Sequence, residues 1–375
     1  MNNISSTIMV LISILRSFLM IYPLLLQRLQ FLCLKAFMQT QNSYILAIES
    51  SCDDTACSIL KNDQVLSNVV AGQEIHRQYG GVVPELASRA HQSHIVPVVD
   101  QALKMAGITK EDLSAIAFTR GPGLMGSLLV GTSFAKSLAL ALEIPLIDVH
   151  HMQGHILAHF IDTGQEKPTF PFLAVTISGG HTQIVKVTDY HEMEVIGTTQ
   201  DDAIGEAFDK SGKMLGLGYP AGPQIDQLAK LGDPKKFPFP IPKAPDLNYS
   251  FSGFKTAVLY FIQREQKNNP DFIKENLYDI CASIQFTLIK ILFQKVEKAV
   301  QQTGIKTVAI GGGVSANTGI REKLVSYDKM GWNTFIPPFE YTTDNAAMIG
   351  ISGYYKFLEG YTAGMETTAS PRIEL

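Results

Sequence analysis

The chain is poor in cysteine and carries no large excess of charge of either sign. Of its 375 residues only four are cysteines, Cys33, Cys52, Cys57 and Cys281, and no two of them form a CxxC pair. Neither a disulfide framework nor a zinc knuckle can be built from this set, and the usage suits a reducing compartment. The formal net charge of −4 argues against a protein that grips nucleic acid by charge alone, although a local patch or a partner could still present such a substrate.

The N-terminal segment also lacks an uninterrupted apolar run of the length that a membrane span needs. Residues 8–38 are mostly Leu, Ile, Phe and Met, but Arg16 and Pro23 break the run before ~18–20 residues accumulate. Three interpretations of this segment stay open: a membrane anchor or signal segment, a mitochondrial transit peptide, and an upstream start codon with Met38 as the working first residue. We favour the start-codon interpretation because a compact strand begins at Tyr44. We therefore expect a cytoplasmic enzyme without stable membrane association, and mitochondrial or membrane targeting only if the extension is real.

This interpretation makes a testable prediction about the N-terminus. A chain that begins at Met38 should be soluble, folded and fully active, because everything before Tyr44 lies outside the internal repeat described next. Circular dichroism and an activity assay on the shortened and full chains would check it. Activity in the full chain together with its loss in the shortened one would contradict the start-codon interpretation.

An internal repeat is the clearest organisational signal. Residues 46–55, LAIESSCDDT, align without gaps on residues 173–182, LAVTISGGHT, with identical Leu, Ala, Ser and Thr at four positions. Each copy is typical of an apolar strand, a tight polar or glycine turn and a second strand, here 56–60 and 183–187. The shared order predicts a duplicated core.

Strands and helices alternate after each copy of the repeat. Such alternation predicts α/β layers, and the length allows two domains of ordinary size. A long proline- and lysine-rich loop without periodicity is expected at 233–249, and loops of this length are usually functional or disordered. The expected helices are 84–106, a segment ending near 142, one starting at 151, and 276–302, 317–327 and 344–358; the further expected strands are 115–119, 145–149 and 307–310.

Two histidines follow the strand that ends at residue 149. His151 and His155 are four residues apart and would share one face of a helix, a spacing suited to holding one metal ion. Their place at the carboxyl end of a strand favours a ligand site, because open α/β sheets bind ligands there. A pair of ordinary core or surface histidines is the alternative. A zincin helix is excluded, because Met152 stands where HExxH has its glutamate.

Glycine turns and carboxylates supply the remaining candidates for chemistry. The turns at 178–181 and 311–317 follow apolar strands, and their N–H groups could approach an anion closely, although neither fits a Walker loop or GxGxxG. Asp344 would either cap a helix or complete a two-histidine, one-carboxylate metal site. Asp209 and Asp226 flank a glycine-rich loop at 216–222 and could accept ribose hydroxyls. The other acidic candidates, which solvated loops could equally hold, are Asp53, Asp54, Asp201, Asp202 and Glu206.

These strings, taken together, resemble the TsaD family, the tRNA N6-adenosine threonylcarbamoyltransferases once described as glycoproteases. The match runs from about Tyr44 to the C-terminus, and Ala221 departs from the glycine that the family commonly has. The nine motifs appear in family order: 48–55 IESSCDDT, 80–89 GGVVPELASR, 121–126 GPGLMG, 150–155 HHMQGH, 178–182 SGGHT, 205–210 GEAFDK, 251–255 FSGFK, 311–317 GGGVSAN and 343–346 TDNA.

The resemblance implies a two-lobed actin-like, sugar-kinase-like ATPase fold. It divides the chain into an extension at 1–43 outside the fold, a first lobe at 44–150 and a second lobe at 151–375 that holds the metal and adenylate site. It implies transfer of a threonylcarbamoyl group from threonylcarbamoyl-AMP to N6 of the adenosine beside the anticodon, in tRNAs that read codons beginning with A. AMP is released.

The resemblance also implies the site residues, one by one. The metal, iron (Fe²⁺) rather than zinc, would be held by His151, His155 and Asp344. The partners would be tRNA, an inactive paralogue of the chain and a small ATPase. The local composition, and not the resemblance, supplies the candidates for tRNA contact around the proline-rich loop: Lys235, Lys236, Lys243 and Lys255. The adenylate would be lined by Thr176, Ile177, Ser178, Gly179, Gly180, Asp209, Gly222, Asp226 and Asn317.

The residues leave the proton acceptor and three rival functions open. Asp53, Asp54 and His181 are equal candidates for taking the proton from the attacking amine, and no Ser-His-Asp triad is present. A sugar-kinase-type phosphotransferase would have no need of the histidine pair. A metallopeptidase would need the HExxH glutamate, which this chain lacks. A non-catalytic nucleotide-binding scaffold would lose no activity if its metal were removed.

Overall fold

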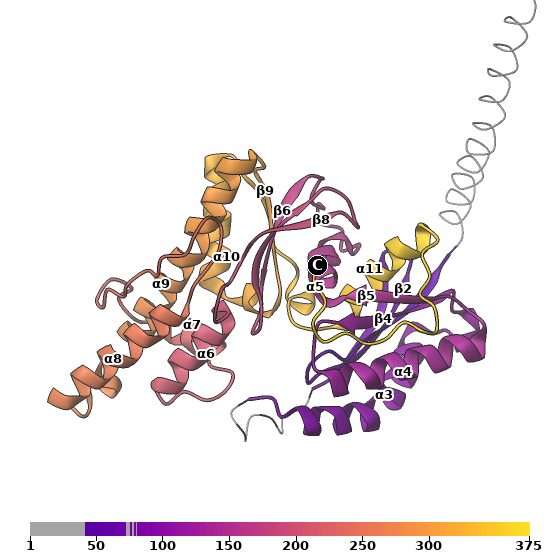
Figure 1. The fold of residues 1–375 in the computed structure, drawn as a ribbon, viewed down its shortest axis with the longest axis horizontal. Helices are drawn as coiled ribbons and strands as arrows, with labels where there is room; N and C mark the ends of the chain where they lie inside the picture. The colour runs from indigo at the N-terminus through magenta and orange to yellow at the C-terminus, as the bar shows by residue number, and fades with distance from the viewer. Residues whose placement is uncertain (1–41, 73–75, 77–78, 80) are drawn as a thin grey trace, which may run out of the picture.

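The computed structural model describes residues 42–72, 76, 79 and 81–375. The N-terminal extension, and with it the start-codon interpretation, lies outside the described residues. The described chain forms two five-stranded sheets with helices on their outer faces and between them (Figure 1).

The first sheet is built around the first copy of the repeat. It comprises β1 (Tyr44–Glu49), β2 (Thr55–Lys61), β3 (Gln64–Ala71), β4 (Ala115–Gly121) and β5 (Leu146–His150). The strand order is β3-β2-β1-β4-β5. β1 pairs antiparallel with β2 on one side and parallel with β4 on the other.

The second sheet repeats this topology around the second copy. Its strands are β6 (Phe172–Ile177), β7 (Thr182–Val187), β8 (Met193–Thr198), β9 (Thr307–Gly311) and β10 (Asn333–Phe335). The order β10-β9-β6-β7-β8 places β6 where β1 stands, antiparallel to β7 and parallel to β9. The duplication predicted from the aligned decapeptides is confirmed.

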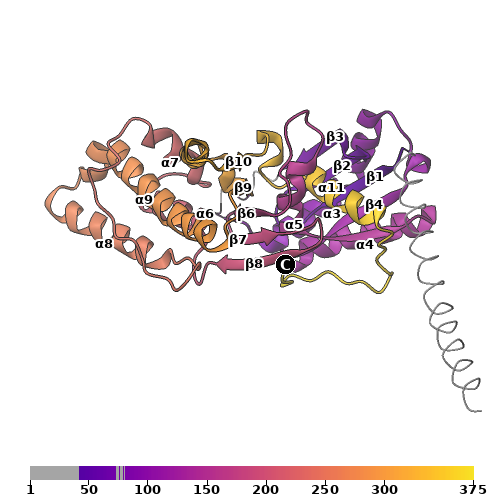
Figure 2. The ribbon, with the colours of Figure 1, turned by 90° about the horizontal axis from the view of Figure 1, so that it is seen from above.

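Helices cover the first sheet on both faces. α3 (Pro84–Ala106) and α4 (Met125–Leu142) pack on its outer face, and α3 begins at Pro84, where the missing N–H costs no hydrogen bond. α5 (His151–Leu157) and α11 (Ala346–Leu358) lie between the two sheets (Figures 1 and 2). α11 rests on the first sheet although it follows the second in sequence, so residues of both halves build this layer.

The outer face of the second sheet carries the other α-helices of the described chain. They are α6 (Ile204–Met214), α7 (Gly222–Ala229), α8 (Ser252–Asn268), α9 (Phe272–Thr303) and α10 (Thr318–Val325), gathered on one side in Figure 1. Short 3₁₀ turns occur at Lys110–Asp112, Ala158–Phe160, Gly313–Ala316, Ser326–Met330 and Phe339–Tyr341.

Alternation along the central strands produces three apolar cores. Leu46 of β1 faces α3 and α4, whereas its neighbour Ala47 faces α5 and α11. In β6, Val175 faces the helices of the second half, whereas Ala174 faces the central layer. Both faces of these strands are therefore buried, which explains why their sequences are continuously apolar.

Two of the described helices, α4 and α9, are long and apolar enough to cross a membrane by length and composition. Both pack on the cores: α4 buries Leu128 and Ala135, and α9 buries Leu288 and Phe293.

Candidate metal centre and adjoining cavity

The β5–α5 junction places the two histidines. α5 starts directly after β5, and the ring Nδ1 of His150 caps it by accepting the N–H of Met152 at 3.1 Å. His151 and His155 then lie one turn apart with ring centroids 4.8 Å apart. Both are buried, with 7% and 1% of their surface exposed. The shared helix face predicted from the spacing is confirmed.

Asp344 approaches the histidines from the start of α11. Its Oδ1 lies 3.5 Å from Nε2 of His151 and 3.2 Å from Nε2 of His155. Ligand-type atoms of the three residues all lie within 4.8 Å of one another. The alternative prediction, that Asp344 caps the helix, is wrong. Asn345 is the cap, because its side chain accepts the N–H of Met348 at 3.1 Å, and this leaves the Asp344 carboxylate facing the histidines.

The charges of this cluster suit a divalent cation. Burial opposes a charge on His151, but the carboxylates of Glu49 and Asp344 outweigh it and hold the pKa of His151 well above its ordinary value. Burial likewise opposes ionisation of Asp344, yet the two histidines hold its pKa well below the ordinary value. Two imidazole nitrogens and one carboxylate with open positions are the donor set of non-haem iron and catalytic zinc sites. The residues therefore fit such an ion, whose binding would displace the proton on His151.

A cavity of about 540 Å³ adjoins the cluster and reaches the second sheet. The β6–β7 turn forms one wall, and the Ser178 hydroxyl closes that turn by accepting the N–H of His181 at 3.0 Å. The residues that line it are Ser51, Cys52, Asp54, Pro122, Gly123, Leu124, His151, Ser178, Gly179, Gly180, His181, Glu206, Asp209, Tyr219, Gly313, Thr343 and Asp344.

The second glycine turn packs against the end of β6. Gly312 has φ of +91°, and a Cβ there would stand 2.5 Å from the carbonyl oxygen of Ile177. Only glycine fits such a position. The close approach brings Gly313 to the cavity wall beside Gly179 and Gly180. The two glycine turns, predicted separately, thus meet at one cavity.

The predicted adenylate residues fall into two groups. Ser178, Gly179, Gly180 and Asp209 line the cavity, and Oδ1 of Asp209 accepts the N–H groups of Ala221 at 2.8 Å and Gly222 at 3.2 Å. The remaining predicted residues do not line the cavity: Thr176, Ile177, Gly222, Asp226 and Asn317.

Two residues of the second group are engaged within the protein. Asp226 accepts both the N–H and the hydroxyl of Thr318, at 3.1 and 2.8 Å. Asn317 caps α10 through Oδ1 and donates its Nδ2 to Gln285 at 2.8 Å. The structure therefore joins them to the start of α10, and a ligand role for them stays a prediction.

Sequence reasoning gave no role to Glu49, Ser51 or Tyr219. Ser51 and Tyr219 line the cavity, and Oε2 of Glu49 contacts Nδ1 of His151. A charged residue at the end of the apolar strand β1 was the available signal for Glu49, since ionised side chains are rarely buried without a partner.

Of the three candidates for a proton acceptor, Asp54 and His181 line the cavity and Asp53 does not. Burial raises the pKa of Asp54 to about 7, and the negative charges of Asp53, Asp344 and Glu49 add to this. Burial, with the nearby His151 and His155, lowers the pKa of His181.

The raised pKa of Asp54 makes a prediction about stability in the metal-free protein. Between about pH 4, near its ordinary value of 3.8, and about pH 7, the folded protein keeps a proton that the unfolded chain has lost, so ionisation increasingly costs stability as the pH rises. Asp54→Asn does not titrate. It should raise the free energy of unfolding at pH 8 by about 1–2 kcal/mol, a figure reduced for partial exposure, and far less at pH 4.5.

Urea unfolding of both proteins in chelator at the two pH values measures this. Asp100→Asn, an exposed carboxylate of α3 far from the cavity, is the control. An equal gain from Asp54→Asn at both pH values would contradict the prediction.

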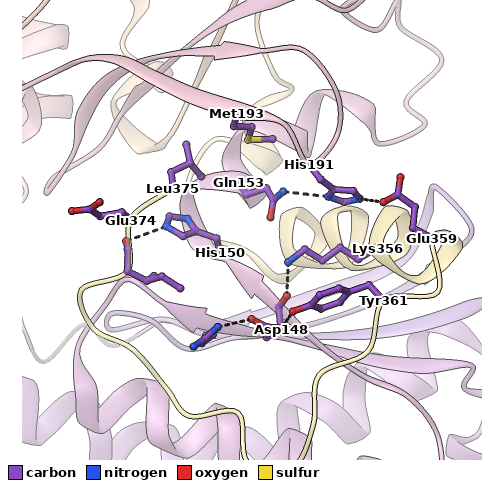
Figure 3. Close-up of a pocket in the computed structure, with 12 residues that line it drawn as sticks. Asp148, His150, Gln153, His191, Met193, Lys356, Glu359, Tyr361, Glu374 and Leu375 are labelled. Atoms are coloured by element: carbon purple, nitrogen blue, oxygen red, sulfur yellow. Dashed lines mark hydrogen bonds and ion pairs between the residues drawn. The ribbon is translucent and has the colours of Figure 1, made fainter.

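A second pocket, of about 440 Å³, is lined by His150 together with residues of β5, α11 and the C-terminal segment (Figure 3). Several of its polar groups contact one another: Asp148 accepts from Arg120 at 3.3 Å and from Tyr361 at 2.7 Å, and Nε2 of His191 lies 3.3 Å from Glu359. Nε2 of His150 lies 3.2 Å from the carbonyl oxygen of Ile373, close to the C-terminus. The last of these contacts ties the C-terminal segment to the β5–α5 junction.

Comparison with protein families matches the chain to one of them. The family model described as TsaD, tRNA N6-adenosine threonylcarbamoyltransferase, matches residues 64–351. A protein of that name from Christiangramia forsetii is 68% identical over 339 residues, which cover 90% of this chain and 100% of that protein. A second, from Riemerella anatipestifer, is 58% identical over 337 residues, 89% of this chain and 99% of that protein.

Solved structures agree on the fold. HypF from T. kodakarensis is similar with a TM-score of 0.56 at 15% identity, over 88% of this chain and 50% of that one. Full-length HypF in a phosphate- and nucleotide-bound form gives 0.54 at 13% identity, over 85% of this chain and 47% of that one. At these identities the likeness concerns the fold alone, and the expected two-lobed actin-like fold is confirmed.

Proposed function

The chain belongs to the TsaD family of tRNA N6-adenosine threonylcarbamoyltransferases, and from this premise we propose how its central cavity performs the reaction. The enzyme transfers a threonylcarbamoyl group from threonylcarbamoyl-AMP to N6 of the adenosine beside the anticodon and releases AMP. The observation that carries the proposal is a single cavity that joins the His151, His155 and Asp344 cluster to two glycine turns.

The second lobe binds the adenylate. Gly179, Gly180 and Gly313 line the cavity and have no side chains, so a phosphate group can approach their backbone N–H groups closely. Oδ1 of Asp209 holds the loop before α7. The other carboxylate oxygen of Asp209 accepts a ribose hydroxyl. We also assign to the adenylate site the remaining predicted residues, Thr176, Ile177, Gly222, Asp226 and Asn317.

His151, His155 and Asp344 hold one divalent metal, Fe²⁺ in preference to zinc. The fit rests on the donor set, two imidazoles and a carboxylate. When bound, the metal supplies an electrophile for the carbamoyl or phosphate oxygens. The placement of the three ligands beside the glycine turns lets the chain's own residues align the acyl group with the incoming amine.

The chemistry needs positioning more than a strong nucleophile, because the acyl-adenylate is already activated. The N6 amine forms a bond to the carbamoyl carbon, the bond from that carbon to the phosphate oxygen breaks, and AMP leaves. The amine's proton passes to Asp54 or His181, the two candidates that line the cavity.

The tRNA is held with the help of partner subunits, an inactive paralogue and a small ATPase. Among the four lysine candidates, Lys236 pairs with Asp279 at 2.6 Å and Lys255 with Asp202 at 2.8 Å. Lys235 and Lys243 form no ion pair with any described residue, which favours them for phosphate contact. We place the reaction in the cytoplasm. We also propose that the chain divides into lobes at 44–150 and 151–375, with α11 packing back on the first lobe.

Reconstitution tests the proposal. The chain is mixed with both partners, the separate enzyme that makes threonylcarbamoyl-AMP, and tRNA that reads codons beginning with A. Labelled threonine should enter the tRNA and appear as threonylcarbamoyladenosine on nucleoside analysis. A complete mixture that modifies no tRNA, while the chain phosphorylates a small molecule or cleaves a peptide, would overturn the transferase proposal in favour of that rival.

A further inference from the structure

Glu49 ends β1 beneath the metal-type cluster and is almost completely buried, with 1% of its surface exposed. No lysine or arginine pairs with it among the described residues. A buried carboxylate without compensation costs several kcal/mol, so its contacts need an account.

Three donors surround this carboxylate. Oε1 accepts the backbone N–H of Ser51 at 2.5 Å, and Oε2 accepts the hydroxyl of Thr119 at 2.6 Å. Oε2 also lies 3.1 Å from Nδ1 of His151, and the hydroxyl of Ser51 lies 3.2 Å from the same nitrogen. An ionised carboxylate has no hydrogen to donate, so the hydrogen between them belongs to the imidazole. Nδ1 of His151 therefore carries a hydrogen, and the lone pair of its neutral form is at Nε2, which faces Asp344 at 3.5 Å.

The second histidine has no such support. Nδ1 of His155 is buried and has no hydrogen-bond partner in the described chain. The ring of His151 is thus the one whose tautomer and orientation are fixed from behind. A carboxylate in this position also makes an imidazole a better ligand.

We propose that Glu49 is a positioning residue of the metal site, which orients His151 by its Nδ1 hydrogen and makes Nε2 the ligand atom. The inference rests on the metal site proposed above. It assigns Thr119 a supporting part, since its hydroxyl fixes the oxygen that faces the imidazole.

Glu49→Gln is the sharpest test, because it changes no volume. The amide can accept from Ser51 only by turning its NH₂ group toward Thr119 and His151. That group donates, so it favours the tautomer in which Nδ1 is bare and Nε2 carries the hydrogen, which cannot bind a metal. We expect affinity for Co²⁺, the probe, to fall about 10–100-fold, as loss of such a partner typically produces.

Co²⁺ binding is followed by its visible absorption and by competition with a chelator, on the full chain. Asp148→Asn is the matched control, because Asp148 is a buried carboxylate of β5, a strand of the same sheet, and pairs with Arg120 and Tyr361 instead. It should bind Co²⁺ as the unaltered chain does, whatever it loses in thermal stability. If Glu49 had only a structural role, Glu49→Gln and Asp148→Asn would bind Co²⁺ with similar affinity.

Each outcome decides a different point. No Co²⁺ binding by the unaltered chain would overturn the metal site itself. Equal affinity in the unaltered chain and Glu49→Gln would overturn the role of Glu49 and leave the site standing. Should Glu49→Gln not fold, Thr119→Val decides: weaker binding supports the proposal, and unchanged binding overturns it.

Discussion

Replacement of His151 by alanine is expected to abolish threonylcarbamoyl transfer and to remove most of the bound metal. His151 Nε2 and His155 Nε2 both face Oδ1 of Asp344, so the variant leaves only two of three protein ligands. His155→Ala and Asp344→Ala should lower metal content in the same way. Metal analysis of the purified proteins and nucleoside analysis of treated tRNA measure the two effects.

The fold should persist in these variants while the stability of His151→Ala falls. Without the imidazole of His151, Glu49 and Asp344 lose the positively charged group between them, and unpaired buried carboxylates lower the free energy of unfolding. The helices and sheets seen by circular dichroism should remain. His159→Gln is the control, because His159 follows α5, is not part of the cluster and lies 2.8 Å from the carbonyl oxygen of Ile310. Stoichiometric metal in all three ligand variants would place the metal elsewhere.

The sequence was most informative where the local pattern and the tertiary environment agree. The strand at 115–119 and the helix at 84–106 were predicted because their apolar residues face cores on the expected side. The duplicated topology followed from the repeat, since equal strand–turn–strand units fold alike. The loop at 233–249 is indeed without helix or extended strand.

Several of the elements that were not predicted lie where that agreement weakens. β3 and β8 are edge strands with partly exposed residues, so alternation along them is blurred. α6 and α7 are short and separated by the glycine-rich loop, which hides their helical period. Such segments take their structure from the sheet beneath them more than from their own sequence.

The composition of the site depends on contacts that no local pattern contains. His155 and Asp344 are 189 residues apart, and Glu49 and His151 are 102 apart. The histidine spacing could be recognised in the sequence. Only the fold shows that Asp344 approaches the histidine pair and that Asn345, not Asp344, caps α11. Adjacent polar residues at a helix start offer two equivalent caps, and packing of α11 on the first sheet selects Asn345.

Asp209→Asn is expected to raise KM for threonylcarbamoyl-AMP about tenfold to hundredfold. The side chain of Asn can still accept the N–H groups of Ala221 and Gly222 through its oxygen, so the loop before α7 should keep its shape. Its NH₂ group replaces the carboxylate oxygen proposed to accept a ribose hydroxyl. Loss of a hydrogen bond to a charged group costs about 1.5–3 kcal/mol, which corresponds to that range.

Steady-state kinetics in the reconstituted mixture, with threonylcarbamoyl-AMP varied, separates this effect from a structural one. Asp202→Asn is the matched control, because Asp202 precedes α6, pairs with Lys210 and Lys255, and does not line the cavity. Asn317→Ala should also weaken use of the adenylate, but with a fall of about 1 kcal/mol in the free energy of unfolding, since it removes the cap of α10. A KM that is unchanged in Asp209→Asn would remove Asp209 from the ribose site and leave the glycine turns as the adenylate contacts on this wall.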